Sequence, residues 1–145
     1  MESYEKRTWW SRHRLTERLV DPGFLEAAIT TAFLIAAADG HASEAEYDAL
    51  LDRLEILGGV DRDRVDEVLT AAASELEASG FEPRIARVAE LVDDTGAAEA
   101  AMMLGLAIGL ADDDFSAEER EIATQLAAAL HVDLELEKLL AEIRG

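Results

Sequence analysis

Hydrophobic residues recur along the chain at the three- to four-residue spacing of amphipathic helices, and strand-like alternation is almost absent. Alanine, leucine, glutamate and arginine dominate, whereas β-branched residues are sparse. Glycine, proline and helix-capping residues divide the chain into segments of helical length. The pattern therefore predicts an all-α fold, a single compact bundle of about seven or eight helices. The predicted helices begin near Glu2, Phe24, Ser43, Asp61, Glu82, Thr95, Ser116 and Asp133.

Two of these helices contain long runs without charge, at residues 27–38 and 100–111. A helix that is apolar on every side must be covered on every side, so we expect both at the centre of the bundle. Each also carries small residues four positions apart, on one stripe. Glycine inside a helix costs about 1 kcal/mol relative to alanine, so a glycine pair there indicates a close contact between the two helices. The small residues are Ala28, Ala32 and Ala36, and Ala101, Gly105 and Gly109.

Each uncharged run ends in the same phrase, A-D-x-x-x-S-x-x-E. It occupies residues 38–46 and, 73 positions later, residues 111–119. The serine and glutamate of each phrase, Ser43 with Glu46 and Ser116 with Glu119, form the S-x-x-E pattern of a capping box at a helix start. The chain is therefore predicted to contain an internal pseudo-twofold repeat of a helix-loop-helix unit.

A pseudo-twofold packing of the two loops would gather four carboxylates around a shared centre. Such a cluster must bind cations, take up protons or remain well solvated. The chain has no cysteine, so these oxygen ligands favour Ca²⁺, Mg²⁺ or Mn²⁺ over Zn²⁺. The alternative is that the same residues only cap helices and shape loops. The four candidate metal ligands are Asp39, Glu46, Asp112 and Glu119.

A helix that ends in A-A-D-G before S-x-x-E, followed later by A-D-x-x-x-S-x-E-E-R, resembles the TerB-like family of tellurite-resistance proteins and related domains. The resemblance covers about residues 24–132. It implies an all-helical domain with a non-enzymatic role in metal or oxyanion stress, in which Asp39, Glu46, Asp112 and Glu119 bind metal. The second phrase departs from the family pattern, because Asp113 replaces the turn glycine.

The chain of 145 residues is half hydrophobic, which is enough for a single domain with a substantial core. Its net charge of −19 disfavours binding to nucleic-acid phosphates. Residues 1–18 nevertheless carry a local charge of +2, so we divide the chain into a basic N-terminal helical segment, residues 1–21, and a TerB-like domain, residues 22–145. The chain opens without an apolar stretch, and we expect a cytoplasmic protein.

The basic segment contains Trp9 and Trp10 among arginines. One reading is a peripheral contact with the inner face of a membrane or with a membrane-associated partner. The other is a terminal helix whose tryptophans pack on the domain while its arginines pair with acidic residues.

The chain shows no arrangement typical of an enzyme. It lacks a Ser-His-Asp or His-x-x-x-His constellation and a phosphate-binding glycine loop. The leading hypothesis is therefore a non-catalytic, metal-binding or metal-sensing adaptor that works through a protein partner. The alternative is an acidic protein-interaction module without metal, recruited to a membrane partner by its basic N-terminus.

Overall fold

The computed structural model describes residues 8–38, 44–55, 61–92, 94–109 and 116–132, together with residues 138 and 141. Within these residues the chain forms eight named helices and no strand, which confirms the predicted all-α class. The helices are α1 (Thr8–Arg12), α2 (Leu15–Arg18), α3 (Pro22–Ala36), α4 (Glu44–Glu55), α5 (Arg62–Ser79), α6 (Phe81–Leu91), α7 (Thr95–Gly109) and α8 (Ala117–Ala129).

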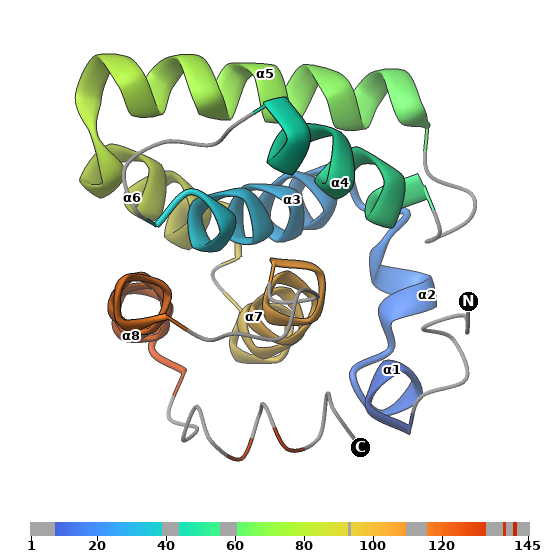
Figure 1. The fold of residues 1–145 in the computed structure, drawn as a ribbon. Coiled ribbons are helices and arrows are strands. Elements are labelled where there is room, and N and C mark those ends of the chain that lie inside the picture. The colour runs from blue at the N-terminus through green and yellow to red at the C-terminus, as the bar shows by residue number, and fades with distance from the viewer. Residues whose placement is uncertain are drawn as a thin grey trace.

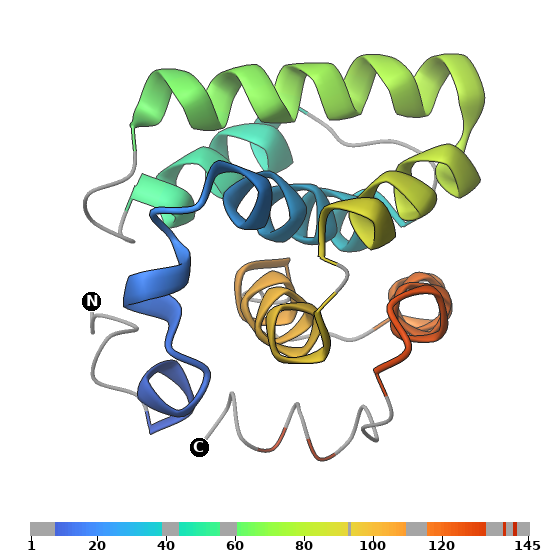
Figure 2. The ribbon, with the colours of Figure 1, turned by 180° about the vertical axis from the view of Figure 1, so that it is seen from behind.

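The helices are arranged in layers around α3. In Figure 1, α5 forms one layer, α3, α4 and α6 lie beneath it, and α7 and α8 lie on the far side of α3. The view from behind shows α6 alongside α3, between α5 and α8, with α1 and α2 at one side of the bundle (Figure 2). Because α3 contacts α4, α5, α6, α7 and α8, it is the central helix of the fold.

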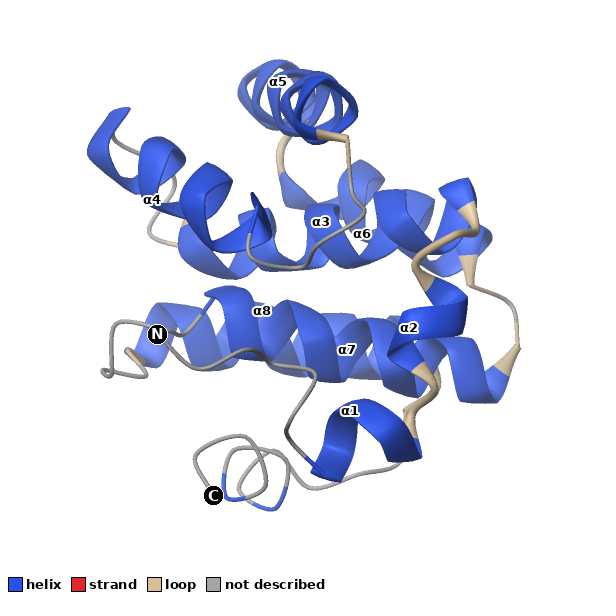
Figure 3. Ribbon diagram, turned by 90° about the vertical axis from the view of Figure 1, so that its right-hand side faces the viewer, coloured by secondary structure: helices blue, strands red, loops and turns tan. Residues whose placement is uncertain are grey.

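The two uncharged helices are buried on every side, as their composition predicts. Every residue is buried from 27 to 35 in α3 and from 100 to 109 in α7. The two helices pack against each other in adjoining layers, as seen in Figure 3. Within the described ranges, no helix is long and apolar enough to cross a membrane.

The predicted close contact between these helices is confirmed at both glycines of α7. A Cβ atom placed on Gly105 would lie 2.7 Å from the Cβ atom of Thr31, and one placed on Gly109 would lie 3.0 Å from the carbonyl oxygen of Ala32. Gly109 also lies against Ile35. The contacts advance in the same direction along both helices, so α3 and α7 run parallel and their C-terminal ends lie on the same side of the bundle.

The N-terminal region departs from the single helix predicted over residues 2–19. Its described part forms two short helices, separated at His13 and Arg14, and Arg14 adopts a left-handed conformation with φ 55°. Across this break, the Trp10 indole N–H donates to the Thr16 hydroxyl at 2.8 Å. The prediction of one continuous helix was wrong because spacing alone does not register a local reversal of this kind.

Trp9 and Trp10 belong to the hydrophobic core, each with only 2% of its surface exposed. Leu15 of α2 is fully buried in the same core. The reading in which the tryptophans pack on the domain is therefore confirmed. One arginine of this region, Arg18, also lies 3.9 Å from Asp94 at the start of α7.

Local sequence signals set most of the other helix boundaries. Asp61 caps α5 through its side chain, at the helix start that the sequence predicts. The side chain of Asp21 accepts a hydrogen bond from the Gly23 N–H and caps α3, which begins at Pro22, two residues before the predicted start at Phe24. Residues 39–43 of the first phrase and most of the predicted helix from Asp133 lie outside the described residues.

Candidate functional site

The two repeated phrases follow helices that match in length and position. Both α3 and α7 have 15 residues, and their first residues, Pro22 and Thr95, are 73 positions apart. The helices that come after the phrases, α4 and α8, also start 73 positions apart, at Glu44 and Ala117. The helix starts therefore follow the spacing of the sequence repeat, and the pseudo-twofold relation itself stays a prediction.

The parallel packing of α3 and α7 places their C-terminal ends, after which the two phrases follow in the sequence, at one end of the bundle. At this end, Arg53 of α4 donates from Nη1 to the carbonyl oxygen of Ile108, near the end of α7, at 3.3 Å. The helix that follows the first phrase thus contacts the helix that leads into the second. In addition, α8 contacts α3. Each helix pair, α3 with α4 and α7 with α8, therefore contacts the first helix of the other pair.

The second phrase forms the predicted capping box. The Ser116 N–H donates to Oε1 of Glu119 at 2.8 Å, and the Glu119 N–H donates to the Ser116 hydroxyl at 3.1 Å. The Glu119 carboxylate is therefore fixed at the N-terminus of α8, where the helix dipole favours negative charge. The matching box of Ser43 and Glu46 lies outside the described side chains.

Among the four predicted metal ligands, only the side chain of Glu119 is described. Asp39 and Asp112 lie outside the described residues, and Glu46 lies in α4 with its side chain outside them. In the part of the chain that is described, no group of three or more His, Cys, Asp or Glu side chains is placed to hold a metal ion.

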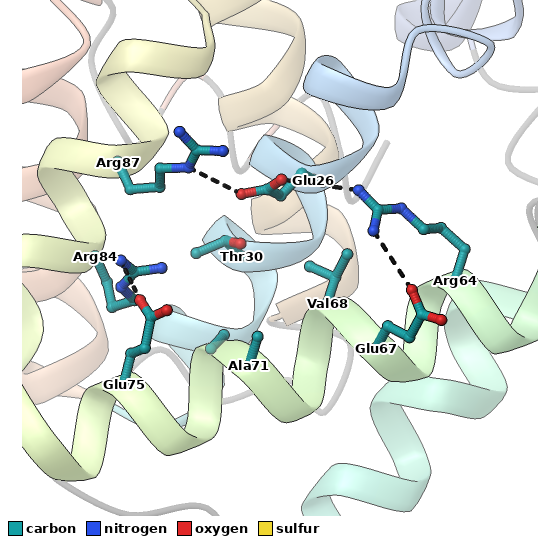
Figure 4. Close-up of a pocket in the computed structure, with 10 residues that line it drawn as sticks. Glu26, Thr30, Arg64, Glu67, Val68, Ala71, Glu75, Arg84 and Arg87 are labelled. Carbon is teal, nitrogen blue, oxygen red and sulfur yellow. Dashed lines mark hydrogen bonds and ion pairs between the residues drawn. The ribbon is translucent and has the colours of Figure 1, made fainter.

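A pocket of about 280 Å³ opens between α3, α5 and α6 (Figure 4). We call it the arginine pocket, because one arginine of α5 and two of α6 line it. Glutamates and small apolar residues complete its wall. The lining consists of Glu26, Thr30, Arg64, Glu67, Val68, Ala71, Ala72, Glu75, Arg84 and Arg87.

Ion pairs join the three helices around this pocket. Oε2 of Glu26 accepts a hydrogen bond from Nε of Arg87 at 3.1 Å, and Oε1 lies 3.8 Å from Nη2 of Arg64. The hydrogen bond that Arg87 donates to Glu26, together with the negative charge of Glu26, raises the pKa of Arg87 above its usual value. Arg84 forms its ion pair with Glu75 of α5. Glu26 therefore links α3 to both α5 and α6.

Arg84 is the most enclosed of the three arginines, with 18% of its side chain exposed. Its Nε is buried and has no hydrogen-bond acceptor within the described ranges. A buried donor without a partner typically costs about 1–3 kcal/mol. An oxygen atom of a bound molecule would remove this cost.

The arginine pocket was not predicted from the sequence, although two of its arginines are close together along the chain. Arg84 and Arg87 are three residues apart and share one face of a helix. Glu26 directly precedes the uncharged run of α3. Their approach to Arg64 depends on how three helices pack, which the spacing within each helix does not reveal.

The fold is that of a small helical domain in which two central helices pack closely, and each of these helices is followed in the sequence by an acidic phrase. The family described as tellurite resistance protein TerB matches residues 25–137, and the chain belongs to this family. The match includes both phrases and confirms the resemblance found from the motifs. No curated protein and no solved structure matches the chain.

Proposed function

We propose that this protein is a non-catalytic TerB-family adaptor that binds a divalent cation and responds through a protein partner in a tellurite or metal-stress system. The proposed ligands are the carboxylates of Asp39, Glu46, Asp112 and Glu119, and the proposed ions are Ca²⁺, Mg²⁺ or Mn²⁺. The observation that carries the proposal is the parallel contact of α3 with α7 at Gly105 and Gly109, which supports a meeting of the two acidic loops.

The chemistry of this end of the bundle supports a cation. Asp39 and Asp112 come three positions after the last residues of α3 and α7 in the sequence, and the negative end of a helix dipole disfavours a carboxylate near it. A bound divalent ion would offset both this repulsion and the repulsion between the loops. Glu119 suits this role because a carboxylate has two oxygens, so one can accept from Ser116 while the other binds an ion.

The alternative function is an acidic protein-interaction module without metal. The capping box of Glu119 favours it, because that contact accounts for the glutamate without a ligand. Recruitment to a membrane partner through the N-terminus would have to use basic side chains, because Trp9 and Trp10 are buried.

Calorimetric titration of the metal-free protein with Ca²⁺, Mg²⁺, Mn²⁺ and Zn²⁺ tests the metal proposal. We expect saturable binding of at least one of the first three ions, weakened by about tenfold or more in the double variant Asp39→Asn, Asp112→Asn. The matched control is Glu17→Gln, Glu90→Gln, which removes the same charge from side chains that are 64% and 72% exposed.

The control sites lie near the opposite end of α3, since Glu17 is in α2 and the end of α6 packs near Gly23. Equal loss in both double variants would indicate a general charge effect. If both double variants lose the same cation affinity, or if the unmodified protein shows no saturable binding, the metal site is rejected and the interaction module remains.

A further inference from the structure

The arginine pocket combines opposite charges in equal number. Eight lysine and arginine residues follow residue 18, and three of them line this pocket. Three glutamates, Glu26, Glu67 and Glu75, line it as well. A net anion would also face the field of a chain with charge −19. The pocket is therefore suited to a molecule that carries both charges and has no net charge.

The pocket holds donors that its own glutamates leave available. A guanidinium has five N–H donors, and Arg84 is paired with Glu75 while its buried Nε has no acceptor within the described parts of the chain. Figure 4 shows the Arg84 guanidinium on the side of the pocket that faces Thr30. A carboxylate placed between them would accept from Arg84 in the geometry that guanidinium groups favour.

The opposite side of the pocket offers acceptors. Arg64 lies 3.8 Å from Glu26 and 3.6 Å from Glu67, beyond the roughly 2.7–3.2 Å of a good hydrogen bond. These two carboxylates therefore retain acceptor capacity toward the pocket. An ammonium group there would be held by charge-assisted hydrogen bonds.

Size and surface limit the occupant to a small molecule. The volume of 280 Å³ lies at the lower end of ligand pockets. Between the charged groups the wall is formed by Val68, Ala71 and Ala72 of α5, which suit a short aliphatic group.

We propose that the arginine pocket binds a small zwitterion, with one carboxylate and one ammonium group on a short aliphatic frame, as in a free amino acid. The carboxylate is bound by Arg84, and the ammonium group is bound by Glu26 and Glu67. None of the residues that line the pocket is a proposed metal ligand, so each site can be tested without the other.

Nuclear magnetic resonance titration of the full chain tests this inference. The probes are L-alanine, propionate, which lacks its ammonium group, and ethylamine, which lacks its carboxylate. We expect saturable shifts of the Arg84 Nε–H and of the Thr30 and Ala71 amides with L-alanine. Propionate and ethylamine should bind about tenfold or more weakly.

Arg84→Gln should weaken L-alanine binding by about tenfold or more. Arg84→Lys keeps the charge but loses the planar fork, so it should also bind more weakly, and it serves as the folded variant if Arg84→Gln does not fold. The control Arg14→Gln removes a 71% exposed arginine outside the pocket and should bind as the unmodified chain does. No saturable shift with L-alanine, propionate binding as tight as alanine, or unchanged binding by the Arg84 variants would overturn the inference.

Discussion

Gly105 of α7 lies directly against Thr31 of α3, with no space between them for a side chain. A Cβ atom on Gly105 would lie 2.7 Å from the Thr31 Cβ and 3.3 Å from the backbone nitrogen of Ala32. Both atoms belong to a helix that is itself enclosed by five others, so it cannot move aside at low cost. This contact fixes how α3 and α7 cross.

Replacing this glycine should therefore destabilise the protein. We expect Gly105→Ala to lower the free energy of unfolding by about 1–3 kcal/mol. This loss would occur although alanine is more favourable than glycine inside a helix by about 1 kcal/mol. Denaturant unfolding measures the change. The matched control is Gly23→Ala, where a Cβ would meet its nearest neighbour at an ordinary 3.5 Å. A neutral effect of Gly105→Ala would show that the central helices are not tightly packed.

The two roles proposed for Glu119 can be separated by conservative replacement. Ser116→Ala removes the side chain that accepts from the Glu119 N–H and should cost about 1 kcal/mol of stability. Glu119→Gln should keep most of that stability, because an amide oxygen also serves in a capping box.

Glu119→Gln should nevertheless weaken cation binding, since an amide is a poorer ligand for a hard cation than a carboxylate. Thermal unfolding measures the stability of each variant, and calorimetric titration measures its cation affinity. The exposed neighbour Glu118, replaced by glutamine, is the control for charge in the same helical turn. Loss of stability without loss of cation affinity would assign Glu119 to the cap alone.

Glu26 and Arg87 should stabilise the packing of α3 on α6 through their hydrogen bond. In a double-mutant cycle with glutamine at both positions, we expect a coupling of about 1 kcal/mol, because 21% of Glu26 is exposed. The comparison pair, Arg14 and Glu17, is 71% and 64% exposed and should couple by no more than about 0.5 kcal/mol. Equal coupling of the two pairs would contradict a special role for Glu26.

His13 should make stability depend on pH. Burial, followed by the positive charge of Arg12, lowers its pKa below 6.5 in the folded chain. At pH values near and below 6.5 the unfolded chain therefore binds more protons than the folded chain. The contribution of neutral, buried His13 to the free energy of unfolding is fully present above pH 6.5 and is lost as the pH falls toward the pKa of His13 in the folded chain. Free energies of unfolding should fall less steeply with acidification in His13→Gln than in the unmodified chain. Around pH 8 the difference between the two free energies should no longer change with pH. Parallel pH profiles would refute this assignment.

Parts of the candidate site were predictable because their causes are local. The capping box of Ser116 and Glu119 spans four residues, and its hydrogen bonds follow from that spacing. The contact of α3 with α7 was predictable because glycine inside a buried helix is costly without a close neighbour. The arginine pocket could not be predicted from such local causes alone, since Glu26, Arg64 and Arg84 come from three different helices.

The sequence was sufficient to predict most of the helices, the two that are buried on all sides and the capping box of Ser116 and Glu119. These properties depend on neighbours within one or two helical turns. The burial of Trp9 and Trp10 in the core, the helix break at Arg14 and the meeting of three arginines with three glutamates around one pocket become known only from the tertiary structure. The physical reason is that each of these outcomes depends on which helix faces come together, and that is set by the packing of the whole bundle.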